Sequence, residues 1–243
     1  MITFFTHCRA FEGEFADIQE CAIESWKSLP HSQVILMGDD SVKEAAKQLN
    51  VEHVLISGYN EYGTALVNAM FKAGESRARH PLCCEISSDI VITITGNRAL
   101  RTIMEIDKPF VIGQRWDVTP GEAESAKKHA PSAVDYFIYR RGTLGEIPPF
   151  AVGRTAYDQW LVWAAQERWG LQTIDATEDI FAVHINHGYP EYGSKEKMRQ
   201  SEEREQNIRL AHNTGCHRWY GTNDTRFVLQ KGKVIERANL SDG

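Results

Sequence analysis

Apolar and polar residues alternate along the first 95 positions in an order that repeats. Short runs of β-branched and aromatic residues predict buried strands, and between these runs the apolar residues recur at helical spacing. Ser41 and Thr64 are suited to cap two of the helices. Strands that alternate with helices over short connections favour an α/β fold, with a mostly parallel sheet and helices on both of its faces. The predicted strands are residues 2–6, 33–37, 51–56 and 82–93, and the predicted helices are residues 15–29, 41–49 and 64–73.

Beyond residue 95 the pattern is less regular. Residues 110–116 and 134–139 predict two further strands, and residues 157–169 predict an aromatic-rich helix. Residues 119–132 are small and charged and have no apolar face, which predicts a surface loop or a lid. Residues 193–212 predict a highly charged helix without a strong apolar stripe.

The segment 82–93 is the most informative, because its apolar run is interrupted by Ser87, Ser88 and Asp89. In α/β proteins, ligands gather at the carboxyl ends of strands, and an aspartate there can hold a divalent cation. The alternative is that Asp89 only caps the following turn. Asp39 ends the second predicted strand in the same way, where it can contact a base or ribose or form a turn.

Two later segments carry further candidates. Asp158 lies in the first turn of a predicted helix, a position that suits a negative charge on dipole grounds alone and also suits a general base. Arg154 lies close by in the sequence and can grip an acceptor or a phosphate. His184 and His187 follow an apolar run. If this run is a strand, its two histidines face different ways, so we expect His184 alone to complete a cation shell and His187 to be partly buried without that role.

Composition and charge narrow the classes of function. The 243 residues are 42% hydrophobic and 25% charged, as in folded proteins, and a net charge of -6 provides no general basic field for nucleic acid. Five cysteines without C-x-x-C spacing predict a reducing compartment and no disulfide framework. The first residues lack a basic leader, and no run reaches the roughly 18 apolar residues of a membrane span, so we expect a cytoplasmic protein.

Three common motifs are absent from the sequence: G-x-x-x-x-G-K-[ST], G-x-G-x-x-G after the first strand, and G-x-S-x-G. Their absence argues against a P-loop enzyme, a dinucleotide oxidoreductase and an α/β-hydrolase, respectively.

The order of the remaining motifs resembles that of the nucleotide-sugar glycosyltransferases of the GT-A fold, over most of residues 1–220. The resemblance rests on Thr6-His7-Cys8-Arg9, Gly38-Asp39-Asp40, Ser87-Ser88-Asp89, the run from Asp135 through Gly153-Arg154, and Asp158-Gln159-Trp160-Leu161. Ser87 stands where the family has the first aspartate of its D-x-D motif. This departure implies weaker metal binding, or a contact made by the serine hydroxyl instead.

The resemblance also implies roles for individual residues. Asp89 would hold Mn²⁺ or Mg²⁺, which bridges the diphosphate of the donor, and His184 would complete the metal shell. Asp158 would deprotonate the acceptor hydroxyl, as in inverting members of the family; retaining members use a different mechanism, and the sequence leaves the choice between the two open. The implied donor-binding residues are Thr6, Arg9, Asp39, Ser87 and Arg154.

For the whole chain, the resemblance implies one domain over residues 1–243. Residues 1–95 would bind the nucleotide sugar, residues 96–220 would form the acceptor and catalytic half, and residues 221–243 would be a C-terminal tail. The expected activity is the transfer of a sugar from a nucleoside-diphosphate sugar, a UDP-sugar first of all, to a hydroxyl acceptor.

Two alternatives remain open at this point. One is a nucleotidyltransferase, although the chain lacks a basic glycine-rich loop after the first strand; the other is a degenerate domain that binds nucleotides without turnover. The acceptor is also open between a glycan, a protein, a small molecule and a modified DNA base. A DNA acceptor would draw on Arg140, Arg141, Arg199 and Arg204, which otherwise form a solvated charged face.

Overall fold

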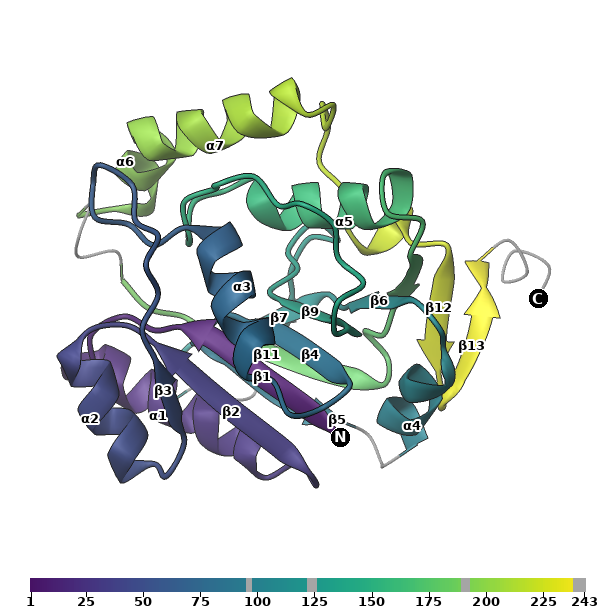
Figure 1. Ribbon diagram of the computed structural model, residues 1–243, viewed down its shortest axis with the longest axis horizontal. Coiled ribbons are helices and arrows are strands. Elements are labelled where there is room, and N and C mark those ends of the chain that lie inside the picture. Colours follow the sequence, from purple (N-terminus) through teal and green to yellow (C-terminus); the bar gives the residue numbers. More distant parts are fainter. Residues whose placement is uncertain (95–97, 122–125, 189–192, 238–243) are drawn as a thin grey trace.

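The computed structural model is a layered α/β fold built around a nine-stranded sheet (Figure 1). It describes residues 1–94, 98–121, 126–188 and 193–237. The strands of this sheet are β1 (Ile2–His7), β2 (Ser32–Met37), β3 (Glu52–Val54), β4 (Leu82–Ile86), β6 (Pro109–Ile112), β9 (Tyr136–Arg140), β10 (Gln172–Asp175), β12 (Phe227–Gln230) and β13 (Lys233–Glu236). They lie in the order β13-β12-β10-β6-β9-β4-β1-β2-β3.

Most neighbouring strands of the large sheet are parallel, as the sequence predicts. Parallel pairing joins β4, β1, β2 and β3, and again joins β6, β10 and β12, whereas β9 and β13 run antiparallel to their neighbours. Because parallel strands end at the same edge, the carboxyl ends of β1, β2 and β4 lie side by side.

A smaller sheet packs beside the large one. Its strands, in order, are β5 (Ile90–Ile94), β11 (Ile180–Ile185), β7 (Arg115–Val118) and β8 (Lys127–Lys128). The helices are α1 (Gly13–Lys27), α2 (Asp40–Gln48), α3 (Val67–Arg77), α4 (Arg98–Glu105), α5 (Tyr157–Glu167), α6 (Lys195–Arg199) and α7 (Glu202–Asn213), with a short 3₁₀ helix η2 (Thr222–Asp224).

Successive side chains of each strand point to opposite faces of the large sheet, and both faces are buried in hydrophobic cores. On β1, Phe5 packs edge-on against Phe71 of α3, with ring centroids 5.4 Å apart. The preceding Phe4 stacks on Trp26 of α1 on the other face, at 6.0 Å. Helices α3 and α5 contribute to the core on the Phe5 face of the sheet. Helices α1, α2 and α4 and the small sheet contribute to the core on the Phe4 face. The prediction of helices on both faces is confirmed.

The prediction of one strand over residues 82–93 is wrong. The chain leaves the large sheet after β4, turns through Ser87, Ser88 and Asp89, and enters the small sheet as β5. The backbone N–H of Ser87 donates to the carbonyl of Asp135 at 2.9 Å, and its carbonyl accepts from the N–H of Ile90 at 3.1 Å. Polar residues in mid-run therefore mark a change of sheet, which periodicity does not distinguish from one longer strand.

The predicted helix caps are also wrong. Helix α2 is capped by the side chain of Asp39, which accepts from the backbone N–H groups of Ser41 and Val42, so Ser41 is not the cap. Helix α3 begins at Val67, after a Leu66 N-cap that makes no side-chain hydrogen bond, so Thr64 lies before the helix.

The second half of the chain is more ordered than the sequence predicts. Within the expected loop 119–132, residues 127–128 form β8 and pair with β7, while residues 122–125 lie outside the described ranges. The single helix expected over 193–212 is two helices, α6 and α7. Residues 227–236, expected to lie in a tail, form β12 and β13 at the edge of the large sheet. Pairing with distant strands creates these elements, and local periodicity does not report such partners.

The described residues contain no helix that is both long enough and apolar enough to cross a membrane. All five cysteines are free thiols, and four of them are buried.

The turn between the two sheets is anchored by Trp26. Its fully buried indole N–H donates to the carbonyl of Ile90 at 2.9 Å. We expect Trp26→Phe to lower the free energy of unfolding by about 2–4 kcal/mol, because it opens a cavity and leaves this carbonyl without a donor. Urea denaturation measures the change, and Trp219→Phe at a half-exposed position is the control, expected to change stability by about 0.5 kcal/mol or less. Equal losses in the two variants would contradict the anchoring role.

Candidate active site

Two adjoining hollows lie at the carboxyl ends of the central strands. The first has a volume of about 670 Å³ and is lined by the ends of β1 and β4, by Asp39, and by residues 62–65. The second has a volume of about 590 Å³ and is lined by Asp158, His184 and residues of α6 and α7. The residues that line both hollows are Arg9, Ser87, Asp89, Gly153, Arg154 and Tyr157. The site therefore has two chambers that meet at the turn between the sheets.

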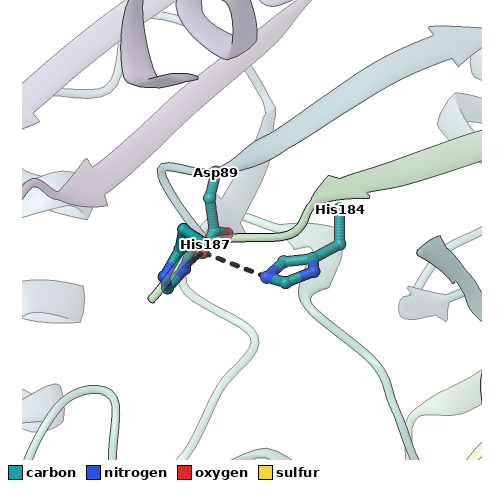
Figure 2. A group of neighbouring side chains, drawn as sticks. All are labelled: Asp89, His184 and His187. Atoms are coloured by element: carbon teal, nitrogen blue, oxygen red, sulfur yellow. Dashed lines mark hydrogen bonds and ion pairs between the residues drawn. The ribbon is translucent and has the colours of Figure 1, made fainter. Parts of the chain in front are cut away.

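Asp89, His184 and His187 form a compact cluster at this junction (Figure 2). The Oδ2 atom of Asp89 lies 3.0 Å from Nε2 of His187 and 3.4 Å from Nε2 of His184. One ligand atom from each of the three side chains can be chosen so that all lie within 4.8 Å of one another. The three residues therefore can surround a single ion.

The expectation that the two histidines face different ways is wrong. His184 lies on β11, paired with Ile90 of β5 and Asp117 of β7. Strand β11 ends at Ile185, so His187 follows the strand and is not bound by its alternation. The turned chain brings His187 back to Asp89, where its ring also packs edge-on against Phe15 at 5.0 Å.

The charge state of Asp89 suits a cation. Burial raises the pKa of this carboxyl, but hydrogen bonds and charge attraction from His184 and His187 outweigh burial and hold the pKa below its usual range. The hydrogen bond to Asp89 raises the pKa of His187 against the effect of burial. The Oδ1 atom of Asp89 is buried and has no hydrogen-bond partner in the described ranges. An ionised carboxylate with one uncommitted oxygen, beside two imidazoles, is a donor set that fits a divalent cation.

Asp158 has the opposite character. Burial and the negative charge of Asp135 raise its pKa to about 7. One carboxylate oxygen accepts from Gln159 Nε2 at 3.0 Å, and the other is buried without a hydrogen bond in the described ranges. The preceding helix cap, Ala156, has a left-handed φ of 97°, which is uncommon for a residue with a side chain. A carboxyl group that titrates near neutral pH and lines the second hollow can accept a proton from a hydroxyl group.

Arg115 ties together two carboxylates that the sequence analysis did not single out. Its guanidinium lies 2.9 Å from Asp117 Oδ1 and 3.1 Å from Asp135 Oδ1. Asp117 Oδ1 in turn lies 3.4 Å from Nδ1 of His184, whose other ring nitrogen faces Asp89, although neither of these two atoms makes a hydrogen bond within the described ranges. Part of the signal was present in the sequence, because Asp117 directly follows predicted strand 110–116, much as Asp39 follows its own strand, whereas Asp135 lies near the start of predicted strand 134–139.

Glu85 was also missed, because it lies inside an apolar run. It is 3% exposed, on β4, and contributes to the floor of the first hollow. Burial, with the charges of Asp135 and Asp158, raises the pKa of Glu85 well above its usual range and so favours its neutral form.

The residues predicted to bind the donor line the first hollow. Thr6 is buried at the end of β1, and Arg9 places its guanidinium 4.8 Å from the centre of the Phe15 ring. Asp39 commits Oδ1 to capping α2, and the hydrogen bond from the Ser41 hydroxyl contributes most to lowering its pKa. The turn role and the position at the hollow therefore coexist.

Arg154 and Ser87 lie at the junction of the two hollows. Arg154 Nε donates to Glu203 Oε2 at 3.1 Å, and a terminal nitrogen of Arg154 lies 3.5 Å from the Thr64 hydroxyl. Because Glu203 is buried on α7, this ion pair holds α7 against the segment before α5, and the contact with Thr64 reaches the loop before α3.

The four arginines considered for DNA do not form one face. Arg140 ends β9, where it pairs with Leu82 at the start of β4, and Arg141 follows it; both bond to backbone carbonyls, Arg140 to that of Asp107 at 2.9 Å. Arg199 and Arg204 line the second hollow, at the opposite edge of the sheet.

No protein-family model and no curated protein matches the sequence, but solved structures match most of the chain. The mannosyltransferase PcManGT from Pyrobaculum calidifontis, in complex with GDP-Man and Mn²⁺, is 10% identical, with a TM-score of 0.52 over 90% of this chain and 65% of that one. Residues 1–349 of S. aureus TarS, in complex with UDP-GlcNAc, are 12% identical, with a TM-score of 0.54 over 91% and 68%. Glucosyl-3-phosphoglycerate synthase from Mycobacterium tuberculosis, with Mg²⁺ and UDP, is 13% identical, with a TM-score of 0.50 over 89% and 79%.

The chain has the GT-A fold. The fold predicted from the order of sequence motifs is thus confirmed by likeness to glycosyltransferases of that fold. At these identities the likeness establishes the GT-A architecture and leaves the activity to be argued from the site. The chain spans 65% of the mannosyltransferase and 44% of a longer TarS structure, so these proteins carry further segments.

We expect the Asp89 cluster to bind Mn²⁺. His184→Ala and His187→Ala should each weaken Mn²⁺ binding by about tenfold or more, because each removes one imidazole ligand. Isothermal titration or Mn²⁺ paramagnetic resonance measures the affinity, and His212→Ala on the exposed side of α7 is the matched control. Unchanged affinity in His187→Ala, with weakened affinity in His184→Ala, would limit the site to the residue that the sequence predicted.

Proposed function

We propose that this protein is a metal-dependent glycosyltransferase, which moves a sugar from a nucleoside-diphosphate sugar to a hydroxyl acceptor. One observation carries the proposal: an ionised Asp89, with two imidazoles, lies where two hollows meet, and Asp158, with a pKa of about 7, lines the second hollow. A group-transfer enzyme needs a donor chamber, an acceptor chamber, and charge stabilisation at their junction.

The first hollow is our proposed donor site. Arg9 supplies positive charge near a diphosphate, and Arg154, which is paired with Glu203, lines the same hollow. Asp39 lies where a base or ribose can be bound, and Thr6 and Ser87 supply hydroxyl groups. Solved structures of similar fold contain GDP-Man, UDP-GlcNAc and UDP, which supports a nucleotide-sugar donor. We propose a UDP-sugar as the first donor to test.

A cation held by Asp89, His184 and His187 would offset negative charge on the departing nucleoside diphosphate. Two imidazoles in the donor set favour Mn²⁺ over Mg²⁺, because Mg²⁺ prefers oxygen ligands. Asp117 would keep the His184 ring in its orientation through Nδ1.

Asp158 is our proposed general base. It would take the proton from the acceptor hydroxyl as that oxygen bonds to the sugar carbon and the bond from that carbon to the diphosphate oxygen breaks. Attack from the second hollow on a donor in the first corresponds to a single displacement with inversion. Gln159 donates to Asp158 and also to the carbonyl of Ser132 at 3.1 Å, which fixes the direction of the carboxylate.

Ser87 is the observation that favours a second candidate, a domain that binds a nucleotide sugar without turnover. A hydroxyl in place of an acid removes one charged ligand from the D-x-D position. The proposed enzyme compensates with His187, a second imidazole beside Asp89. A nucleotidyltransferase is less well supported, since the residues after β1 contribute Arg9 as their one basic side chain.

We expect UDP-sugar binding to depend on both Mn²⁺ and Asp89. Isothermal titration or thermal shift with UDP-, GDP-, ADP- and CDP-sugars, with and without Mn²⁺, measures this dependence. Asp89→Ala should lose the Mn²⁺-dependent part of the affinity, about tenfold or more, while Asp17→Ala on the exposed side of α1 should behave as the unaltered protein. Failure of every donor to bind, with or without the metal, would sink the proposal.

We also expect turnover to increase with pH through a midpoint near 7. Asp158 acts as a base only when ionised, and its raised pKa keeps it protonated below that value. Release of UDP from the donor, with water as acceptor, gives kcat/KM across pH 5–9. Asp158→Asn should lower kcat by about 10²-fold or more and abolish the rise of kcat/KM with pH, the acidic limb of the profile.

Asp107→Asn, at an exposed position outside both hollows, is the control and should retain the limb. A limb that persists unchanged in Asp158→Asn would assign the base to another group. UDP release by the unaltered protein that is no faster than without protein, despite tight donor binding, would favour the binding domain.

A further inference from the structure

The second hollow has two ends of different chemistry. Asp158 and Asp135 are partly buried lining residues, and we call their part of the hollow the buried end; Arg199 and Trp219 are exposed and Arg204 is partly exposed, and we call their part the open end. An acceptor that fills this hollow therefore meets acids at one end and cations with an aromatic surface at the other.

The two arginines differ from the other basic residues of the hollow. Arg115 is neutralised by Asp117 and Asp135, and Arg154 is paired with Glu203. Arg199, by contrast, has no ion-pair partner within the described ranges. Arg204 pairs through one terminal nitrogen with the half-exposed Glu205, at 3.0 Å, and its buried Nε has no hydrogen-bond partner among the described residues. Positive charge is thus unbalanced at the open end.

Trp219 supplies an apolar surface beside these charges. Its side chain is 51% exposed, and it lines both the second hollow and an adjoining hollow of about 430 Å³. An exposed indole costs free energy in water, and at a ligand site it packs against the C–H face of a sugar ring.

The segment that carries Trp219 is held rigidly. The guanidinium of Arg218 lies 3.7 Å from the centre of the Tyr220 ring and 2.6 Å from Asp224 Oδ1. The next residues are tied down as well, because the backbone N–H of Thr222 donates to the carbonyl of Pro131 at 2.9 Å. A platform fixed before the ligand arrives loses little conformational entropy on binding.

We propose that the acceptor is an anionic saccharide, a sugar that carries a phosphate or carboxylate group. Its ring packs on Trp219, its anionic group binds to Arg199 and Arg204, and its reactive hydroxyl points toward Asp158. That this saccharide is the acceptor rests on the proposed glycosyltransferase function. That the hollow binds an anionic saccharide does not depend on it.

Charge also orients the acceptor. An anionic group in the place of the reactive hydroxyl would lie beside Asp158, whose ionised carboxylate repels it. The same group at the open end meets two guanidinium groups, which bind phosphate and carboxylate through paired N–H donors. Only the orientation with the hydroxyl inward satisfies both ends.

Binding can be measured without any donor. Glucose 6-phosphate, glucuronic acid and methyl glucoside are titrated into the ¹⁵N-labelled full chain, and the indole N–H signals of its six tryptophans are followed. The Trp219 signal is assigned by its loss in Trp219→Phe. We expect both anionic sugars to shift this signal, and to bind about tenfold or more tightly than the neutral methyl glucoside.

The double variant Arg199→Gln and Arg204→Gln should remove this preference and leave weak binding equal for all three sugars. Arg209→Gln, on the same helix α7 and paired with Glu202 outside the hollow, is the matched control and should keep the preference. Trp219→Ala should weaken the binding of all three sugars alike, by about tenfold. A phosphate-only or carboxylate-only preference would identify which anion the site takes.

The inference is overturned if the anionic sugars bind no better than methyl glucoside, or if the arginine variants keep the preference. UDP-sugar titration of the same samples separates this result from the proposed function. Donor binding without anionic-sugar binding overturns only the acceptor assignment. Arginine-dependent binding of anionic sugars without donor binding overturns only the glycosyltransferase.

Discussion

The site depends on one constraint, the place where the chain passes from the large sheet to the small one. Strand β4 ends in the large sheet and β5 begins in the small sheet, so the three residues between them must cross from one to the other. The indole of Trp26 holds Ile90, and the carbonyl of Asp135 holds Ser87, on either side of Asp89. These two hydrogen bonds place the carboxylate of Asp89 at the junction of the two hollows. Strand β11 pairs with β5 beside it and carries His184, and His187 follows this strand.

Around that turn, buried acids are held in different charge states by their neighbours. Asp89 stays ionised because two imidazoles face it, whereas Asp158 titrates near neutral pH because burial and Asp135 disfavour its charge. Burial favours the neutral form of Glu85 in the first hollow, and Arg115 balances Asp117 and Asp135. Separated pKa values among neighbouring carboxyl groups are the property that lets one site stabilise positive charge and also accept a proton.

Similarity to the solved structures establishes the fold of this chain and not its activity, because proteins of one fold carry out different reactions. The chemistry has to come from this chain's own residues, and it departs from the family pattern at Ser87. The second imidazole at Asp89 is a physical reason why the loss of an acid there need not abolish metal binding. The same reasoning gives the second hollow its proposed ligand, since it is lined by Arg199, which has no ion pair in the described chain, and by the exposed indole of Trp219.

By itself, the sequence determined the alternation of strands and helices and the mostly parallel sheet, because these follow from periodicities of two and 3.6 residues, and it marked Asp89 as a polar break in an apolar run. It also indicated Asp158, at the start of a helix. Only the tertiary structure decided that residues 82–93 divide between two sheets, and that His187 returns to Asp89. Periodicity describes how side chains alternate within one element, whereas these contacts arise where an element ends and a distant strand becomes its neighbour.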